Sequence, residues 1–253
     1  EELVHDILSE CAWKDNPLGF PILGTVETLS GIERDQIISY MKDNYLPQNT
    51  VISVAGNFSE DKMINLIKER FSTWKASGST PKECGSAGFN PGIKIKEKDT
   101  EQIHICIAFE GIEHGDDDIY SLLTVNNVLG GGMSSRLFQK IREESGLVYS
   151  IYSYPSSYKK TGLFTIYAGM NPENLNEVLH LIIEETKKLA NNGIAKDELE
   201  KSKEQLKGNY ILGLESTSSR MNSIGKSELL LGYINRPDEI LRKIDSINED
   251  DVE

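Results

Sequence analysis

The chain has 253 residues, 38% hydrophobic and 26% charged, so it is long enough for two globular domains of ordinary size. Its formal net charge of −13 disfavours nucleic acid as a partner, because phosphate backbones are also negative. No apolar run approaches the roughly 18 residues needed to span a bilayer, and three cysteines without a C-x-x-C pair suggest neither a disulfide framework nor a thiolate metal site. We therefore expect a cytoplasmic protein that has no membrane partner.

The first part of the chain reads mainly as helices. The opening EELVHDILSECAW has helical spacing, and the prolines and glycines of NPLGFPILG predict a loop over residues 16–24. Ser30 and Glu33 form a capping box that predicts the next helix, and Ser59 caps another. Between these helices TVISVAG, Thr50–Gly56, reads as a buried strand. A single strand cannot satisfy its own backbone, so this part of the chain reads as an incomplete domain.

The next segment marks a domain boundary. Residues 76–92, ASGSTPKECGSAGFNPG, are rich in Gly, Ser and Pro and have little periodicity, which is typical of a linker. We therefore predict the C-terminal part of a first domain at residues 1–75 and a second α+β domain at residues 93–253, without its last strand.

The second domain alternates strands and helices. QIHICIAFEG places Ile103, Ile105 and Ile107 on one face of a strand, and LVYSIYSYP and GLFTIYAG predict two more strands joined by a short polar turn. Helices are predicted at residues 117–129 and 134–144, after Asn171 and Pro172, and two or three times over residues 195–248. This order predicts an α+β fold in which helices cover one face of an antiparallel sheet.

Metal ligands are scarce. His180 and Glu184 share a helix face, but that face lies opposite the apolar stripe, which favours an ordinary solvated pair. His114 precedes the acidic run 116–118, and acidic residues entering a helix are explained by its dipole. The sequence contains neither H-E-x-x-H nor H-x-x-E-H, and no G-x-S-x-G, P-loop or Rossmann pattern. We expect no metal site within this chain.

The stretch GGGMSSRLFQKIREESGLVYS contains the candidate site residues. Gly130, Gly131 and Gly132 precede an amphipathic run, and Arg142 and Tyr149 stand seven positions apart. Taken alone, the glycines are typical of a tight connection between helices, and an Arg at the edge of a helix is typical of a solvated flank.

Four segments together resemble a known family. NPLGFPILG, YMKDNYLPQNTVISVAGNF, LGGGMSSRLFQKIREESGLVYSIYSY and LESTSSRMNSIGKSELLLG occur in this order between Pro17 and Gly232. They resemble the insulinase and pitrilysin family of zinc peptidases (inverzincins), most of all mitochondrial processing peptidase and the bacterial processing proteases. The resemblance implies a metalloendopeptidase whose paired α+β domains enclose a peptide-binding chamber, with an extended substrate added to a sheet edge.

The resemblance also implies roles for particular residues. In this family the first domain holds one zinc through H-x-x-E-H and a distant Glu, and the second domain contributes an Arg and a Tyr. These match Arg142 and Tyr149, which would bind substrate and support the transition state, since an Arg donates to peptide carbonyls and a phenol to a developing oxyanion. Gly130, Gly131 and Gly132 would form a substrate loop.

The chain departs from the family pattern because the zinc motif is absent. We expect the zinc ligands of a longer parent protein to precede Glu1, and we expect this chain alone to be inactive. The expected partners are a peptide substrate and either the missing N-terminal segment or a second homologous chain. Two alternatives are a non-catalytic homologue that acts as a structural or partner subunit, and an interaction module that serves as a lid. The Arg and Tyr spacing favours the active peptidase.

Overall fold

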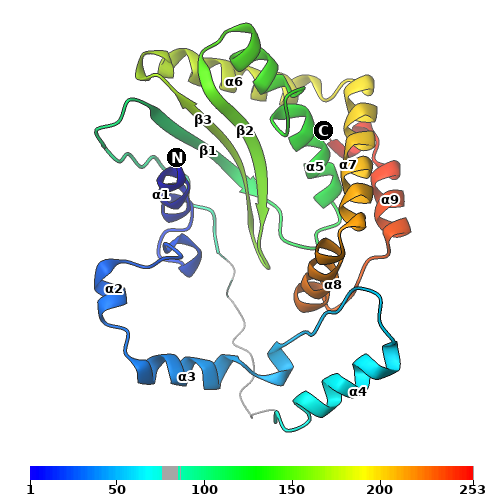
Figure 1. Ribbon diagram of the computed structural model, residues 1–253. Coiled ribbons are helices and arrows are strands. Elements are labelled where there is room, and N and C mark those ends of the chain that lie inside the picture. The colour runs from blue at the N-terminus through cyan, green and yellow to red at the C-terminus, as the bar shows by residue number, and fades with distance from the viewer. Residues whose placement is uncertain (76–84, 86, 253) are drawn as a thin grey trace. The chain divides into compact units, whose positions relative to one another are not determined.

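The computed structural model describes residues 1–75, 85 and 87–252, and the described part contains helices and one antiparallel sheet (Figure 1). The predicted α+β class is confirmed. No helix among the described residues is both long and apolar enough to cross a membrane. The elements are α1 (Glu2–Ala12), η1 (Pro17–Gly19), α2 (Val26–Ser30), α3 (Arg34–Asn44), η2 (Pro47–Asn49), α4 (Glu60–Phe71), β1 (Ile103–Gly111), α5 (Ile119–Leu129), η3 (Phe138–Glu144), β2 (Val148–Ser157), β3 (Gly162–Met170), η4 (Pro172–Asn174), α6 (Leu175–Asn192), α7 (Lys196–Glu215), α8 (Thr217–Leu231), α9 (Pro237–Ser246) and η5 (Glu249–Val252).

The chain divides into two compact units. The sheet unit comprises Glu1–Ile22, Gly85–Gly208 and Pro237–Glu253, and the helical unit comprises Leu23–Cys84 and Asn209–Arg236. Each unit therefore contains segments distant in the sequence. The linker predicted at residues 76–92 falls largely outside the described residues, and the division into sequence domains stays a prediction.

The sheet has the strand order β1-β3-β2, with β3 antiparallel to both neighbours. Ile107 of β1 and Ser153 of β2 both pair with Ile166, so the middle strand has a neighbour on each side. Every residue of β3 is buried, which explains its nearly continuous apolar sequence. The three strands predicted from periodicity are all present.

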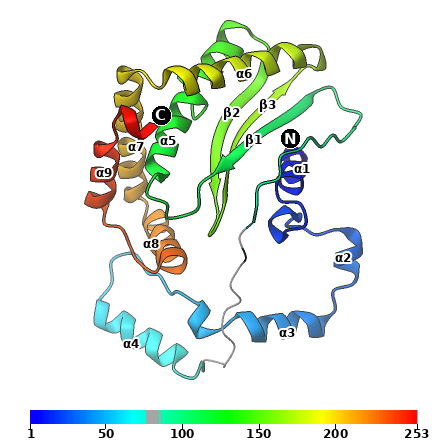
Figure 2. The same cartoon turned by 180° about the vertical axis from the view of Figure 1, so that it is seen from behind.

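One face of the sheet carries the main core. Side chains from α5, η3 and α6 pack against this face, and the two sides of the cartoon are shown in Figures 1 and 2. Leu137, Ile141 and Val178 are fully buried there, together with Ile166 of the sheet. Burial of each such side chain contributes about 1.5–3 kcal/mol, so this core fixes η3 and α6 against the strands.

Helix α1 packs against the opposite face. Ala12 and Trp13, at the C-terminal end of α1, form a second buried cluster with Leu163 of β3. The ring of Trp13 meets that of Tyr158 edge-on with centroids 5.0 Å apart. The sheet is therefore also partly covered on its second face.

The prediction of a strand at Thr50–Gly56 is wrong. This segment of the helical unit is not a strand and pairs with no strand of the described chain. Its exposure alternates, with Ile52 and Val54 turned to solvent, while the Ser53 hydroxyl donates to the carbonyl of Met221 at 2.7 Å. The β-like pattern is present, but the unit offers helices rather than a strand to accept its backbone hydrogen bonds.

The start of α3 also differs from the prediction. Ser30 ends α2, and the capping box that begins α3 is formed by Glu33 and Gln36, whose side-chain oxygen accepts from the Glu33 amide at 2.8 Å. Two overlapping S/T/E-x-x-E/Q patterns were possible in this stretch, and pattern alone does not decide between them.

Candidate functional site

The first glycine of the candidate loop joins α5 to the sheet. The Gly130 carbonyl accepts a hydrogen bond from the Ser153 amide of β2 at 2.9 Å, so this loop pairs with the outer edge of β2. A Cβ at position 130 would lie 2.5 Å from the Ser153 Oγ and 2.6 Å from its amide nitrogen. Only glycine permits this approach of one backbone to another.

The next two glycines differ in what surrounds them. A Cβ on Gly131 would lie 2.8 Å from the Asn127 Cα, whereas one on Gly132 would meet nothing nearer than the Gln205 Nε2 at 3.7 Å. The Gly132 carbonyl accepts from the Ser135 hydroxyl at 2.6 Å, which starts the following helix. Packing therefore explains the first two glycines, and a role of all three as a substrate loop stays a prediction.

The helix predicted at residues 134–144 widens into a π-helix, η3, over Phe138–Glu144. The Leu147 amide donates to the Ile141 carbonyl at 3.1 Å, across six residues, and Gly146 ends the helix with φ of 63°. Glycine adopts this left-handed conformation without the penalty that a Cβ brings. The glycine signals the helix end, but nothing in the sequence distinguishes π from α winding. π-Helical turns are frequent at functional sites.

Both predicted site side chains are exposed. Arg142 follows the buried Ile141, its guanidinium carbon lies 4.9 Å from the centre of the Phe138 ring, and it forms no ion pair with any described residue. Tyr149 is 57% exposed and occupies the β-bulge between Val148 and Ser150, where it has no partner on β3. A bulge changes the direction of a side chain relative to the regular strand. The structure thus places Arg142 and Tyr149 on either side of a short turn, both accessible to a ligand.

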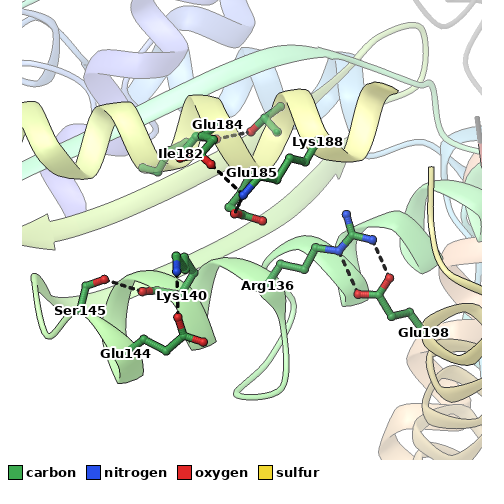
Figure 3. A network of polar contacts seen from close by, with 10 residues as sticks. Arg136, Lys140, Glu144, Ser145, Ile182, Glu184, Glu185, Lys188 and Glu198 are labelled. Carbon is green, nitrogen blue, oxygen red and sulfur yellow. Dashed lines mark hydrogen bonds and ion pairs between the residues drawn. The ribbon is translucent and has the colours of Figure 1, made fainter. Parts of the chain in front are cut away.

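Two side chains, those of Arg136 and Asn174, hold this segment to its surroundings through hydrogen bonds, and the sequence interpretation missed both. At its start, the Arg136 guanidinium binds the Glu198 carboxylate through two nitrogens, at 2.9 and 2.5 Å (Figure 3). It also donates to the Gly193 carbonyl at 3.2 Å. At its end, the Asn174 side-chain amide donates to the Leu147 carbonyl at 2.9 Å. No local pattern signals either contact, because the partners lie 27 or more positions apart.

The Arg136–Glu198 pair shifts both groups toward their charged forms. The hydrogen bond to Glu198 raises the pKa of the Arg136 guanidinium, and the same bond lowers the pKa of the Glu198 carboxyl. Glu198 also accepts from the Ala195 amide at 3.1 Å, near the start of α7. The pair is therefore ionised and directionally fixed, as a bidentate Arg–carboxylate contact requires.

The described residues do not assemble a zinc site. No group of three or more His, Cys, Asp or Glu side chains in this part of the chain could hold a metal ion. The Glu184 carboxylate binds Lys188 at 2.8 Å, which lowers the pKa of Glu184, and Figure 3 shows both residues on α6. The amide of His114 donates to the Tyr158 carbonyl at 2.7 Å. The donor set therefore does not fit a zinc ion.

A partly buried cysteine, Cys106, lies on the second face of the sheet. The Cys106 Sγ is 3.6 Å from the His5 Nδ1, which is 2.7 Å from the Tyr154 hydroxyl. Burial raises the pKa of the Cys106 thiol to about 12, so almost no thiolate is present at neutral pH. Cys106 is therefore a poor nucleophile in this structure.

Comparison with known proteins now gives the class of the molecule. The family profile described as the peptidase M16 inactive domain matches residues 31–206, more than half of the chain. The chain belongs to the peptidase M16 family, and the resemblance to the insulinase and pitrilysin peptidases is confirmed.

Two relatives have zinc protease in their names. An uncharacterized zinc protease of Bacillus subtilis (strain 168), YmxG, is 45% identical over 248 residues, covering 98% of this chain and 60% of the relative. An uncharacterized zinc protease of Streptomyces coelicolor, SCO5738, is 36% identical over 261 residues, covering 99% of this chain and 56% of the relative. The chain thus spans well under two thirds of the length of these relatives.

Solved structures share the fold at low sequence identity. A peptidase M16 inactive domain from Pseudomonas fluorescens matches with a TM-score of 0.85 at 18% identity, covering 99% of this chain and 60% of that one. A chain of Complex III2 from Candida albicans, with Inz-5 bound, matches with a TM-score of 0.80 at 23% identity, covering 99% and 61%. The same architecture therefore occurs both in a protein named for a peptidase and in a subunit of a larger complex.

Proposed function

We propose that this chain supplies the substrate-binding half of a zinc metalloendopeptidase, and that the zinc-binding half belongs to another part of a longer protein. The names of the relatives support the reaction class, and the share of their length that this chain spans supports the division. The observation that carries the proposal is the exposure of Arg142 and Tyr149 around one anchored turn.

The two side chains would act on a bound peptide in different ways. The Arg142 guanidinium has five N–H donors and can hold peptide carbonyls, while the Tyr149 hydroxyl can donate to the oxygen of the scissile carbonyl as negative charge develops there. Neither step requires a group within this chain to change its charge. The zinc of the parent protein would supply the activated water, and in this proposal the peptide lies in a chamber between the two halves.

A second function is a non-catalytic subunit. The match to a chain of Complex III2 favours it, because that chain has the same fold within a large assembly. Arg142 and Tyr149 argue for the peptidase, since a structural subunit has no need of an exposed cation and phenol at this spacing. The two proposals differ in whether loss of these side chains affects peptide turnover.

The test replaces each side chain in the full-length protein. We expect Arg142→Ala and Tyr149→Phe each to lower turnover of a fluorogenic peptide on the order of 100-fold or more, because loss of one oxyanion donor or misplacement of the substrate by about 1 Å costs about that much. Zinc content and Tm should stay nearly unchanged, since both side chains are exposed.

Lys140→Ala is the matched control, because Lys140 is a partly exposed cation on the same helix and forms an ion pair with the neighbouring Glu144 at 2.9 Å. It should retain turnover. Full activity of both site variants would overturn the proposal, and so would a full-length protein that binds zinc but cleaves no peptide.

A further inference from the structure

The segment that carries Arg142 and Tyr149, residues 136–149, is hydrogen-bonded to both ends of one helix. We call it the tied segment. Helix α6 runs from Leu175 to Asn192, and Asn174 and Gly193 are its two flanking residues. Asn174 donates to the Leu147 carbonyl, and Gly193 accepts from Arg136. Figure 3 shows the helix that begins near Arg136 lying alongside α6.

The contact between these helices has an apolar part and a polar part. Leu137 and Ile141 are fully buried and share the main core with Val178 and Ile182 of α6, which fixes the face that the segment presents. The hydrophobic effect is not directional, so these contacts specify the position of the segment along the helix axis less sharply than hydrogen bonds do. Directional hydrogen bonds at the two ends oppose sliding along this axis.

We propose that Arg136 and Asn174 are positioning residues, which hold the turn between Arg142 and Tyr149 at the place where a peptide is bound. Arg136 sets the start of the segment through the planar fork to Glu198, and Asn174 sets its end one residue before β2. This inference rests on the proposed function, because it concerns the placement of the same two side chains. Arg136 and Asn174 themselves need not touch the substrate.

The electrostatic surroundings favour a geometric role for Arg136. Its side chain is 20% exposed and lies close to two carboxylates, Glu198 and Glu185, both of which favour its charged form. Glu185 also binds Lys188 at 2.8 Å, so it retains a cation without Arg136. Replacing Arg136 by Lys keeps the charge and removes the fork, which separates geometry from charge.

The experiment measures peptide turnover by the full-length protein. We expect Arg136→Lys and Asn174→Asp each to lower kcat/KM on the order of 10- to 100-fold, as displacement of a binding group by about 1 Å does. Zinc content should be unchanged, and circular dichroism should report a folded protein. Asp at position 174 keeps the size of the side chain, but it loses the donor and places a negative charge beside the Leu147 carbonyl, so the hydrogen bond cannot form.

Lys207→Gln is the matched control. Lys207 is also 20% exposed and also joins α7 to another element, through Asp245 at 2.6 Å, but it lies outside the tied segment. We expect this variant to lose stability comparable to that of Arg136→Lys without loss of turnover. A loss of turnover equal to that of Arg136→Lys would show a general effect of weakened packing and overturn the inference.

A double-mutant cycle separates this inference from the proposed function. If Arg136 acts through the site, Arg136→Lys should cause no further loss in a protein that already carries Arg142→Ala and Tyr149→Phe. The same fold-loss in both backgrounds would overturn the positioning role and leave the proposed function intact. Full activity of the Arg142→Ala/Tyr149→Phe background would overturn the proposed function and the positioning role with it.

Discussion

At position 130 the backbone of the loop lies so close to the backbone of Ser153 that a side chain does not fit. We expect Gly130→Ala to lower the free energy of unfolding by about 1–3 kcal/mol, because the new methyl group would overlap the backbone and side chain of Ser153. Urea denaturation of the chain, followed by circular dichroism, gives this value. Gly132→Ala provides the comparison, since its Cβ would have room and should change stability by less than about 0.5 kcal/mol. A loss for Gly130→Ala as small as that for Gly132→Ala would mean that the loop can move away from β2 at little cost.

Individual residues also show what the sequence could predict about the site. Arg142 and Tyr149 could be selected only because a family motif places them, since spacing alone also fits a solvated flank. Their exposure depends on Ile141 filling the core, which the amphipathic run predicts, and on the bulge at Tyr149, which no local pattern specifies. Arg136 could not be selected at all, because its role depends on Glu198, 62 positions away.

At the scale of elements, we expect the stability of the contact between α1 and the sheet to depend on the protonation of His5. Burial is the largest cause that lowers the pKa of His5 below its ordinary value of 6.5, on the face where α1 meets Tyr154. Above pH 6.5 both the folded and the unfolded chain carry a neutral His5. As pH falls below 6.5 the unfolded chain binds the proton first, so the free energy of unfolding decreases until the folded His5 is also protonated.

The measurement for His5 is the Tm of the chain at pH 7.5 and at pH 5.5. We expect the Tm to fall over this range, and His5→Gln to fall less, because the amide cannot take up a proton there. His104, whose pKa burial also lowers, is present in both proteins, so the difference between them reports His5 together with its electrostatic interaction with His104. An equal decrease in the Tm of both proteins would show that protonation of His5 does not affect the stability of the chain.

Elements differ in how far the sequence determines them. The three strands of the sheet were predictable because alternation in β1 and the apolar run of β3 reflect which faces are buried. Thr50–Gly56 has an equally good pattern and forms no strand, since a strand needs a partner and pattern carries no information about one. The π winding of η3 was unpredictable for a related reason, because it differs from α only in which carbonyl each amide selects.

For the molecule as a whole, we expect the two units to differ in the hydrogen-exchange rates of their extended segments. We expect its amides to exchange hydrogen much faster than those of Ile103–Phe109 when the chain is purified alone, because β1 is paired along its length and this segment has no strand partner in the described chain. Hydrogen exchange read by mass spectrometry gives both rates in one experiment. Mass spectrometry of the intact sample checks for a second copy or a co-purified fragment that could pair with the segment. Equal protection in a monomer free of any fragment would contradict our interpretation of the first part of the chain as incomplete.

The strand order β1-β3-β2 affects when each strand can pair during synthesis of the chain. β2 and β3 are joined by a tight turn, in which the Tyr158 amide donates to the Thr161 carbonyl at 2.8 Å, and hairpins of this kind form within about 1–10 μs. β1 leaves the ribosome well before β3, and at about 5–20 residues per second it waits on the order of several seconds for that strand. During this interval the isoleucines of β1 have no sheet to cover them. We therefore expect β1 to be prone to self-association in the newly made chain until β3 has been synthesised to pair with it.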